Sequence, residues 1–153
     1  MRYNVRIKRL FALWMQASVT SALLHDLGHF LLDERSDNHR FLSQDLNHEE
    51  IGSTYLQPFF PPSITEPIRL HVPAKRYLCT VDLAYYDSLS DASQRSFHVQ
   101  GGAMSSKEKV DFEKLDYFEA ATQLRIWDDC AKVQGSQSPD LEAYRDTVLQ
   151  CLS

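Results

Sequence analysis

The sequence predicts a single all-α domain, and three observations support this prediction. The length of 153 residues fits one domain, since domains usually have roughly 100–200 residues. Helix-capping residues and apolar residues at helical spacing recur along the chain. No stretch alternates apolar and polar residues as a half-buried strand does. Hydrophobic residues make up 43% and charged residues 24% of the chain, which is typical of a globular protein and excludes a disordered or fibrous one.

The chain opens with 25 residues that include four basic and no acidic side chains. We expect an amphipathic helix that begins the fold. The alternative is a targeting segment, because mitochondrial presequences are also poor in acidic residues. The apolar stretch Leu10–Met15 is short for a signal peptide, however, and the segment leads directly into the most chemically distinctive motif of the chain.

Helix signals continue after this segment. Closely spaced leucines in the stretch Ala17–Leu32 predict a helix through His29, and the polar stretch Asp33–Asp45 predicts a loop. Asn47 followed by Glu50 matches a capping box and predicts a helix that runs through Leu56.

Two prolines shape the next predicted helix. Ser63 is a suitable cap for a helix through His71, with Pro67 in its first turn. We expect Pro73 to disturb the end of this helix, because proline removes a backbone donor and clashes with the preceding turn.

The second half of the chain carries further caps. They predict helices that start after Ser90, after Ser105 with its partner Glu108, and after Ser138 with Pro139. The helix after Ser105 is expected to continue or restart through Ala131. The Gly101-Gly102 pair is the strong glycine turn of the sequence.

Composition excludes several function classes. A net charge of −5 argues against a surface that neutralises nucleic-acid phosphates. No apolar run reaches the roughly 18 residues that span a membrane, so we expect neither a nucleic-acid nor a membrane partner. The three cysteines share no CxxC spacing and are odd in number, which favours reduced thiols and a cytoplasmic location.

Histidines beside an aspartate point to a metal site. His25 and His29 lie four residues apart on one predicted helix face, and Asp26 follows His25 directly. His48 begins the next predicted helix and His71 ends the one after it. A nitrogen and oxygen ligand set without thiolate favours iron, manganese, zinc or magnesium. We expect His39 and His98 to be structural.

Several short motifs occur in a particular order. They are ALLHDLGH (Ala22–His29), NHEEIGSTYL (Asn47–Leu56), HVPAKRYL (His71–Leu78), LSDAS (Leu89–Ser93), QGGAM (Gln100–Met104) and LRIWDD (Leu124–Asp129). Together they resemble the HD-domain superfamily, in particular its branch of phosphonate-cleaving mixed-valence di-iron oxygenases related to myo-inositol oxygenase. The match covers about Ser21–Lys132. The resemblance implies a single HD-domain helical bundle over residues 21–153, after a divergent segment of residues 1–20.

The resemblance also implies a role for each matching residue. One iron would be held by His25, Asp26 and Asp128. The second would be held by Asp26 as a bridge, His48 and His71. The substrate would be bound by His29, Lys75, Ser93 and Arg125, of which His29 and Lys75 are also candidate catalytic residues. In this family the di-iron centre uses dioxygen to cleave the C–P bond of a 1-hydroxyphosphonate, with release of phosphate. Lysine and arginine suit such an anion because they offer a point charge and a planar fork of donors.

The sequence departs from this family before the HD motif. Family members have a further helix there, which supplies a histidine to the first iron and a tyrosine–glutamate pair that closes over the substrate. Here the first histidine is His25, and Tyr3 has no glutamate beside it. We therefore expect an N-terminally shortened member that binds at most one iron well and has low or absent oxygenase activity. An HD-type metal-dependent phosphohydrolase and a non-catalytic metal- or anion-binding remnant remain the alternatives.

Overall fold

A computed structural model describes residues 2–33, 47–132, 135 and 137–153, and their regular secondary structure is entirely helical, as the sequence predicts. The elements are α1 (Arg2–Leu24), α2 (Leu27–Asp33), α3 (His48–Leu56), α4 (Pro62–Val81), α5 (Leu83–Ser88), α6 (Asp91–Val99), α7 (Ser106–Glu113), α8 (Phe118–Ala131), the short 3-10 helix η2 (Leu141–Tyr144) and α9 (Arg145–Leu149). The loop expected at Asp33–Asp45 lies, apart from its first residue, outside the described residues.

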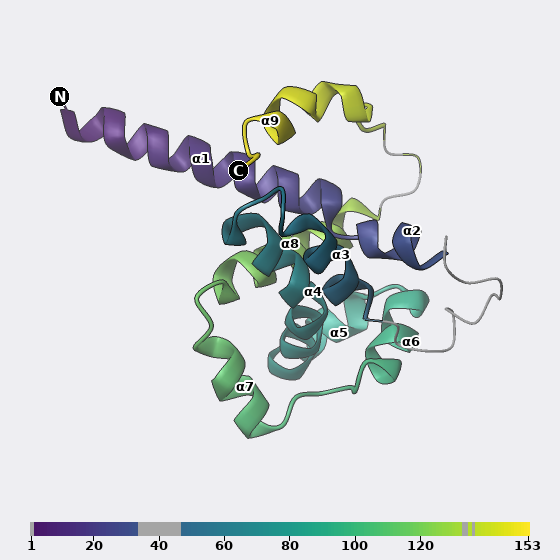
Figure 1. Ribbon diagram of the computed structural model, residues 1–153. Helices are drawn as coiled ribbons and strands as arrows, with labels where there is room; N and C mark the ends of the chain where they lie inside the picture. The colour runs from purple at the N-terminus through teal and green to yellow at the C-terminus, as the bar shows by residue number, and fades with distance from the viewer. Residues whose placement is uncertain (1, 34–46, 133–134, 136) are drawn as a thin grey trace.

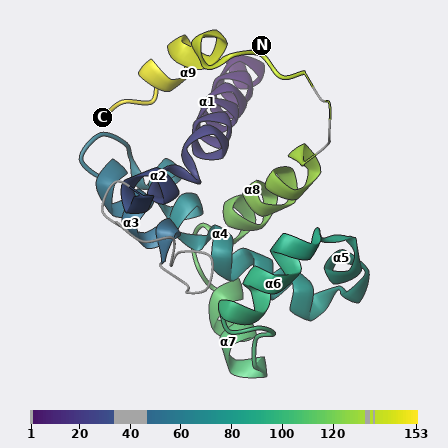
Figure 2. The same cartoon turned by 90° about the vertical axis from the view of Figure 1, so that its right-hand side faces the viewer.

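Helix α4 forms the centre of the bundle and packs against α1, α3 and α8 (Figures 1 and 2). It runs through both Pro67 and Pro73 to Val81, so the predicted end near His71 is wrong. The helix also begins at Pro62 after an extended Pro61, rather than at the predicted cap Ser63. Pro67 and Pro73 have no backbone N–H and so cannot donate a hydrogen bond within the helix. Burial of residues on several sides of α4 stabilises the helix in spite of this loss.

A turn at His25 and Asp26 interrupts the helical structure, where one continuous helix was predicted. Helix α1 ends at Leu24 and α2 begins at Leu27, so the two residues lie in a turn. The break allows α2 to pack on α3 at very close range. A Cβ atom added to Gly28 would lie 1.8 Å from the backbone oxygen of His48. The lack of a side chain at this glycine therefore permits the contact between the two helices.

Among the described residues, the core divides into three apolar clusters around α4. The first contains Leu56, Phe60, Ile64 and Ile68, against which α1 and the C-terminal residues pack. The other two lie toward α7 and α8, and toward α5 and α6. The cysteines Cys79, Cys130 and Cys151 are free thiols, as predicted. Apolar contacts of these clusters join the helices of the described part of the chain.

Helix caps agree with the sequence in part. Ser90 accepts a hydrogen bond at the start of α6, and Ser105 with Glu108 forms the predicted capping box of α7. The capping hydrogen bond predicted for the Asn47 side chain is not formed, and this residue adopts a left-handed backbone conformation with φ 50°.

Of the predictions for the C-terminal part of the chain, one helix cap was wrong, whereas the helix restart and the glycine turn were correct. The final helical segment is capped by Asp140 instead of the predicted Ser138. The chain does restart as α8 after a turn that follows α7. Gly101 and Gly102 have φ values of 102° and 66°, as a glycine turn requires.

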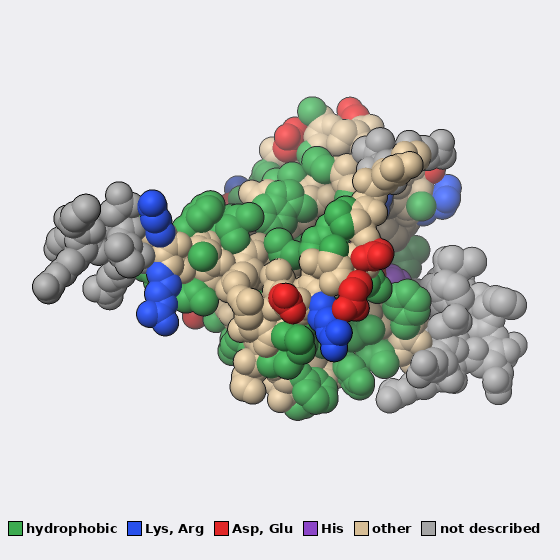
Figure 3. All heavy atoms as spheres, turned by 90° about the horizontal axis from the view of Figure 1, so that it is seen from above, with side chains coloured by type: hydrophobic (Ala, Val, Ile, Leu, Met, Phe, Trp, Pro, Cys, Tyr) green, Lys and Arg blue, Asp and Glu red, His purple; other side chains and the backbone are tan. Residues whose placement is uncertain are grey.

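Helix α1 confirms that the acid-free N-terminal segment is helical, and its first half extends away from the bundle (Figure 1). Apolar side chains remain exposed along it, including Phe11 at 62% and Trp14 at 46%. Figure 3 shows this apolar surface beside the basic side chains of the helix. The predicted division between residues 20 and 21 falls within α1 and stays a prediction. None of the described helices combines the length and apolar character needed to cross a membrane.

Candidate metal centre

The five predicted metal ligands meet at one place, although they come from four parts of the chain. His25 and Asp26 lie in the turn between α1 and α2, and His48 is the first residue of α3. His71 lies in the middle of α4, and Asp128 near the end of α8. The packing of α1, α3 and α8 on α4 thus brings together residues up to about a hundred positions apart.

Asp26, His48 and His71 form the tightest part of this cluster. One potential ligand atom from each lies within 4.8 Å of the others. The two Nε2 atoms of His48 and His71 are 3.1 Å apart, and Asp26 Oδ1 lies 3.8 Å from His48 Nε2. Both histidines are buried, whereas Asp26 is half-exposed. A divalent cation could be held here by two ring nitrogens and a carboxylate oxygen.

Two histidine rings are oriented by backbone carbonyls. His71 Nδ1 is 2.7 Å from the carbonyl oxygen of Ile68, and His25 Nδ1 is 2.8 Å from that of Ala22. Because a carbonyl can only accept, each Nδ1 carries a proton, and the Nε2 of each ring faces the cluster. Metal-binding histidines are commonly oriented in this way.

His25 Nε2 provides a direct test of whether the residues fit a metal ion. This atom is buried and has no hydrogen-bond partner among the described residues. It lies 3.4 Å from Asp26 Oδ2 and 3.5 Å from Asp128 Oδ1. Burial by itself would lower the pKa of His25, but Asp128 and Asp26 outweigh burial and raise it. The two carboxylates thus favour a positive charge beside His25, which either a proton on Nε2 or a bound metal ion would supply.

His48 and His71 are held in the neutral state that metal binding requires. Burial lowers the pKa of His48 to about 3, and the nearby His29 and Lys75 contribute to this effect. Burial also lowers the pKa of His71, with a further contribution from His48. Neither ring needs to lose a proton at neutral pH before it binds a cation.

Four residues of the cluster, Asp26, His48, His71 and Asp128, line a cleft of about 740 Å³. The cleft is also lined by the four predicted substrate residues His29, Lys75, Ser93 and Arg125. His29 is half-exposed, and its ring stacks on that of His48 with a centroid distance of 3.9 Å. The volume is in the range of small-molecule sites. The structure therefore brings the predicted ligands and the predicted anion-binding groups to the same cavity.

Lys75 is a buried cation in this cleft, and its side chain donates a hydrogen bond of 2.7 Å to Ser96 Oγ. Burial, together with the charges of Arg125 and Lys132, lowers the pKa of Lys75 to about 8. Ser93 is buried one turn earlier on α6. Ser96 was missed in the sequence, because serines give no signal of their own without the fold.

Arg125 is more firmly engaged than the sequence suggested. Its Nε donates to Asp129 Oδ2 at 2.9 Å, its Nη2 contacts Asp129 Oδ1, and its Nη1 lies 3.0 Å from Asp128 Oδ2. Burial by itself would lower the pKa of Arg125, but the hydrogen bond with Asp129 and the two carboxylate charges raise it. The hydroxyl of Tyr85 donates to Asp129 as well. Sequence reasoning missed Asp129, although its spacing four residues after Arg125 on one helix could have revealed it.

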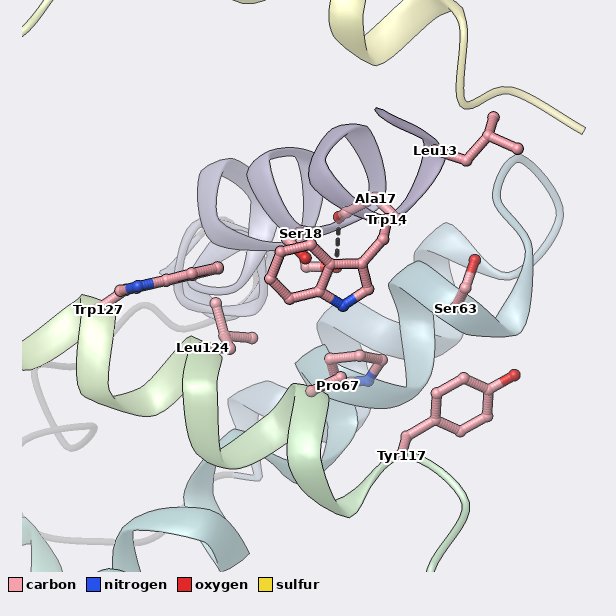
Figure 4. Close-up of a pocket in the computed structure, with 11 residues that line it drawn as sticks. Leu13, Trp14, Ala17, Ser18, Ser63, Pro67, Tyr117, Leu124 and Trp127 are labelled. Atoms are coloured by element: carbon pink, nitrogen blue, oxygen red, sulfur yellow. Dashed lines mark hydrogen bonds between the residues drawn. The ribbon is translucent and has the colours of Figure 1, made fainter. Parts of the chain in front are cut away.

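A second, apolar cavity of about 240 Å³ lies between α1, α4 and α8 (Figure 4). Trp14, Pro67 and Trp127 line it, and the two indole rings are 6.3 Å apart. Trp127 thus packs between helices and does not line the cleft. With mostly apolar lining residues, this cavity offers no ligands for a metal.

The chain is similar to two curated phosphonate dioxygenases. It is 52% identical over 134 residues to hydroxymethylphosphonate dioxygenase of Gimesia maris, in a match that covers 88% of this chain and 67% of that protein. It is 37% identical over 129 residues to the glycine-betaine-forming [1-hydroxy-2-(trimethylamino)ethyl]phosphonate dioxygenase of Leisingera caerulea, covering 80% of this chain and 62% of the relative.

A third relative is an uncharacterised protein of Acanthamoeba polyphaga mimivirus, 35% identical over 137 residues, with 88% of this chain and 62% of the relative covered. No family model matches the chain. The matched part thus spans about two thirds of the length of these relatives. The level of identity with the two dioxygenases shows the family, and the chain belongs to the phosphonate dioxygenases.

Proposed function

We propose that this protein is an iron-dependent dioxygenase that cleaves the C–P bond of a 1-hydroxyphosphonate. The observation that carries this proposal is a cleft lined by four of the predicted ligands, Asp26, His48, His71 and Asp128, together with Lys75 and Arg125. The fifth ligand, His25, lies against Asp128. The similarity to two phosphonate dioxygenases supports the same chemistry. For hydroxymethylphosphonate, one dioxygen molecule would convert the dianion to formate, hydrogen phosphate and one proton.

The ligand set proposed for iron is His25, Asp26, His48, His71 and Asp128. Neutral imidazoles and carboxylates suit this metal, and the unpartnered Nε2 of His25 is consistent with it. Iron, when bound, would activate dioxygen, and the electrons that reduce the dioxygen would come from the substrate. We keep the prediction that at most one iron binds well, since the tight ligand group contains Asp26, His48 and His71.

The role of the chain's own side chains is to bind and orient the anion. With a pKa of about 8, Lys75 is charged at neutral pH and can donate to a phosphonate oxygen. Arg125 and Ser93 would offer further donors from α8 and α6. His29 would face the substrate from α2, where its ring is stacked on that of His48. These groups would hold the carbon atom of the scissile bond close to the metal ligands.

Oxygen dependence tests the proposed reaction. The purified chain, reconstituted with Fe(II), should release inorganic phosphate from hydroxymethylphosphonate in air and not under nitrogen, with one formate formed per phosphate. In line with the prediction of a single well-bound iron, the rate should be low. Hydrolysis of a phosphomonoester under nitrogen would instead support the phosphohydrolase alternative. Metal binding with neither activity would support a non-catalytic protein and contradict the proposal.

Iron content tests the proposed ligands separately from turnover. The His71→Ala variant should lose most of its bound iron, because it removes a buried ring nitrogen of the tightest ligand group. His98→Ala is the matched control, since His98 lines the same cleft and is hydrogen-bonded to Tyr86 instead. Equal iron content in the two variants would contradict the ligand assignment. About two irons per wild-type chain would contradict the prediction of a single well-bound ion.

A further inference from the structure

We infer that Asp129 and Tyr85 are positioning residues, which hold the Arg125 guanidinium in the orientation that the anion site needs. Neither residue is among the ligands or substrate contacts predicted from the sequence. The inference rests on the proposed function only in taking the cleft to bind a phosphonate-type anion.

Asp129 holds the guanidinium at two points. Its Oδ2 accepts from Arg125 Nε at 2.9 Å and its Oδ1 contacts Arg125 Nη2, which is the paired geometry of a carboxylate with an arginine fork. The two side chains are 16% and 5% exposed, so the pair is largely shielded from water. Such a pair fixes the plane of the guanidinium as well as its distance from the carboxylate.

Tyr85 fixes the other side of the pair from a different helix. Its hydroxyl donates to Asp129 Oδ2 and lies 3.4 Å from Arg125 Nε. Because Tyr85 belongs to α5 and Asp129 to α8, this contact ties the carboxylate to a second element of the bundle. The orientation of Arg125 is therefore set by two helices.

In this orientation, Arg125 contacts one oxygen of Asp128 and leaves the other oxygen near His25. Arg125 Nη1 lies 3.0 Å from Asp128 Oδ2, which leaves Asp128 Oδ1 facing His25 Nε2 at 3.5 Å. Of the five guanidinium N–H groups, the contacts with Asp129 and Asp128 account for three, and Arg125 also lines the cleft. We assign the remaining N–H of each Nη atom to the anion. Without Asp129, the guanidinium would be free to turn fully onto Asp128 and away from an anion.

A positioning role and a simple charge effect predict opposite results. The Asp129 carboxylate is a negative charge near the cleft, so as a charge alone it opposes anion binding. Its replacement in Asp129→Asn would then tighten the binding of an anion. If Asp129 positions Arg125, the same variant weakens anion binding, because a charge-assisted hydrogen bond is lost.

The experiment measures the affinity of the full chain for inorganic phosphate by titration calorimetry, in samples matched for iron content. We expect Asp129→Asn to weaken phosphate binding about tenfold, which corresponds to about 1.4 kcal/mol. Tyr85→Phe, which removes only the hydroxyl, should weaken binding in the same direction and to a smaller extent. Asp116→Asn is the control for the loss of a negative charge, because Asp116 is exposed, and it should leave the affinity unchanged.

Tighter or unchanged phosphate binding in Asp129→Asn would overturn the inference, as would the absence of phosphate binding by the wild-type chain. If Asp129→Asn does not fold, as judged by circular dichroism, the Tyr85→Phe result decides in its place. With hydroxymethylphosphonate as substrate, the two variants should raise KM more than they lower kcat. Weaker phosphate binding in the variants of a chain without C–P cleavage would retain the inference and reject the proposed function.

Discussion

Replacing the buried Lys75 should make the protein more stable and bind anions more weakly. Burial, with help from the charges of Arg125 and Lys132, lowers the pKa of Lys75 from 10.5 to about 8. This difference corresponds to roughly 3 kcal/mol of destabilisation at neutral pH. Lys75→Met keeps the length of the side chain and removes the charge. It also removes the hydrogen bond to Ser96, worth about 1 kcal/mol, so the net gain in the free energy of unfolding should be about 2 kcal/mol.

The sign of the pH dependence follows from the same pKa. Between the folded pKa of about 8 and the unfolded value of 10.5, the unfolded chain binds a proton that the folded chain does not. The contribution of Lys75 to wild-type stability therefore rises with pH across this window. The cost of burying the charge is fully present below about pH 8. The advantage of Lys75→Met should accordingly be largest near pH 7 and vanish near about pH 10.

Urea denaturation of the chelator-treated wild type and variant, at both pH values, measures this difference. Groups common to both proteins cancel in the comparison. Lys114→Met is the control, because Lys114 is 70% exposed and its replacement should give no comparable gain. The reasoning is refuted if Lys75→Met is less stable than the wild type at neutral pH, or if its advantage does not shrink as the pH rises. Phosphate affinity unchanged by Lys75→Met would show that this lysine does not hold the anion.

Three other changes probe the packing and the caps. In Gly28→Ala the new Cβ would meet the His48 carbonyl oxygen at 1.8 Å; we expect a loss of at least about 2 kcal/mol in urea denaturation together with less bound iron, and an unchanged midpoint would refute the close contact. Ile68→Ala empties a position with 0% exposure and should cost about 2–5 kcal/mol in the same assay, whereas a smaller loss would mean that the core collapses around it. Ser105→Ala removes the capping box with Glu108 and should lower the thermal midpoint through a loss of about 1 kcal/mol; equal midpoints would contradict the cap.

Local signals predicted the parts of the fold that depend on local interactions. The caps at Ser90 and Ser105 and the glycine turn at Gly101 need only neighbouring residues, and they were correct. The end predicted near His71 was wrong, because Pro73 is only a local obstacle to a helix. Burial of α4 among its neighbours outweighs the loss of that backbone hydrogen bond, and no local pattern reports such burial.

The cluster of candidate metal ligands could be predicted from motif order, whereas the orientation of its side chains could not. The HD motif and the spaced histidines indicated His25, His48 and His71, which do meet in the structure. The turn at His25 and Asp26 was missed, since the sequence around it has helical spacing. This turn presents both residues to α4 and α8 at once, which a continuous helix would not do.

By itself, the sequence determined that this protein is a helical domain with a histidine–aspartate site, since helix periodicity, caps and motif order are properties of the chain. Only the tertiary structure decided that Tyr85 joins the Arg125–Asp129 pair, because α5 and α8 are distant in sequence and adjacent in space. The same holds for Lys75. The sequence shows that a lysine is present, but its pKa of about 8 arises from the burial of its side chain and from the cations Arg125 and Lys132.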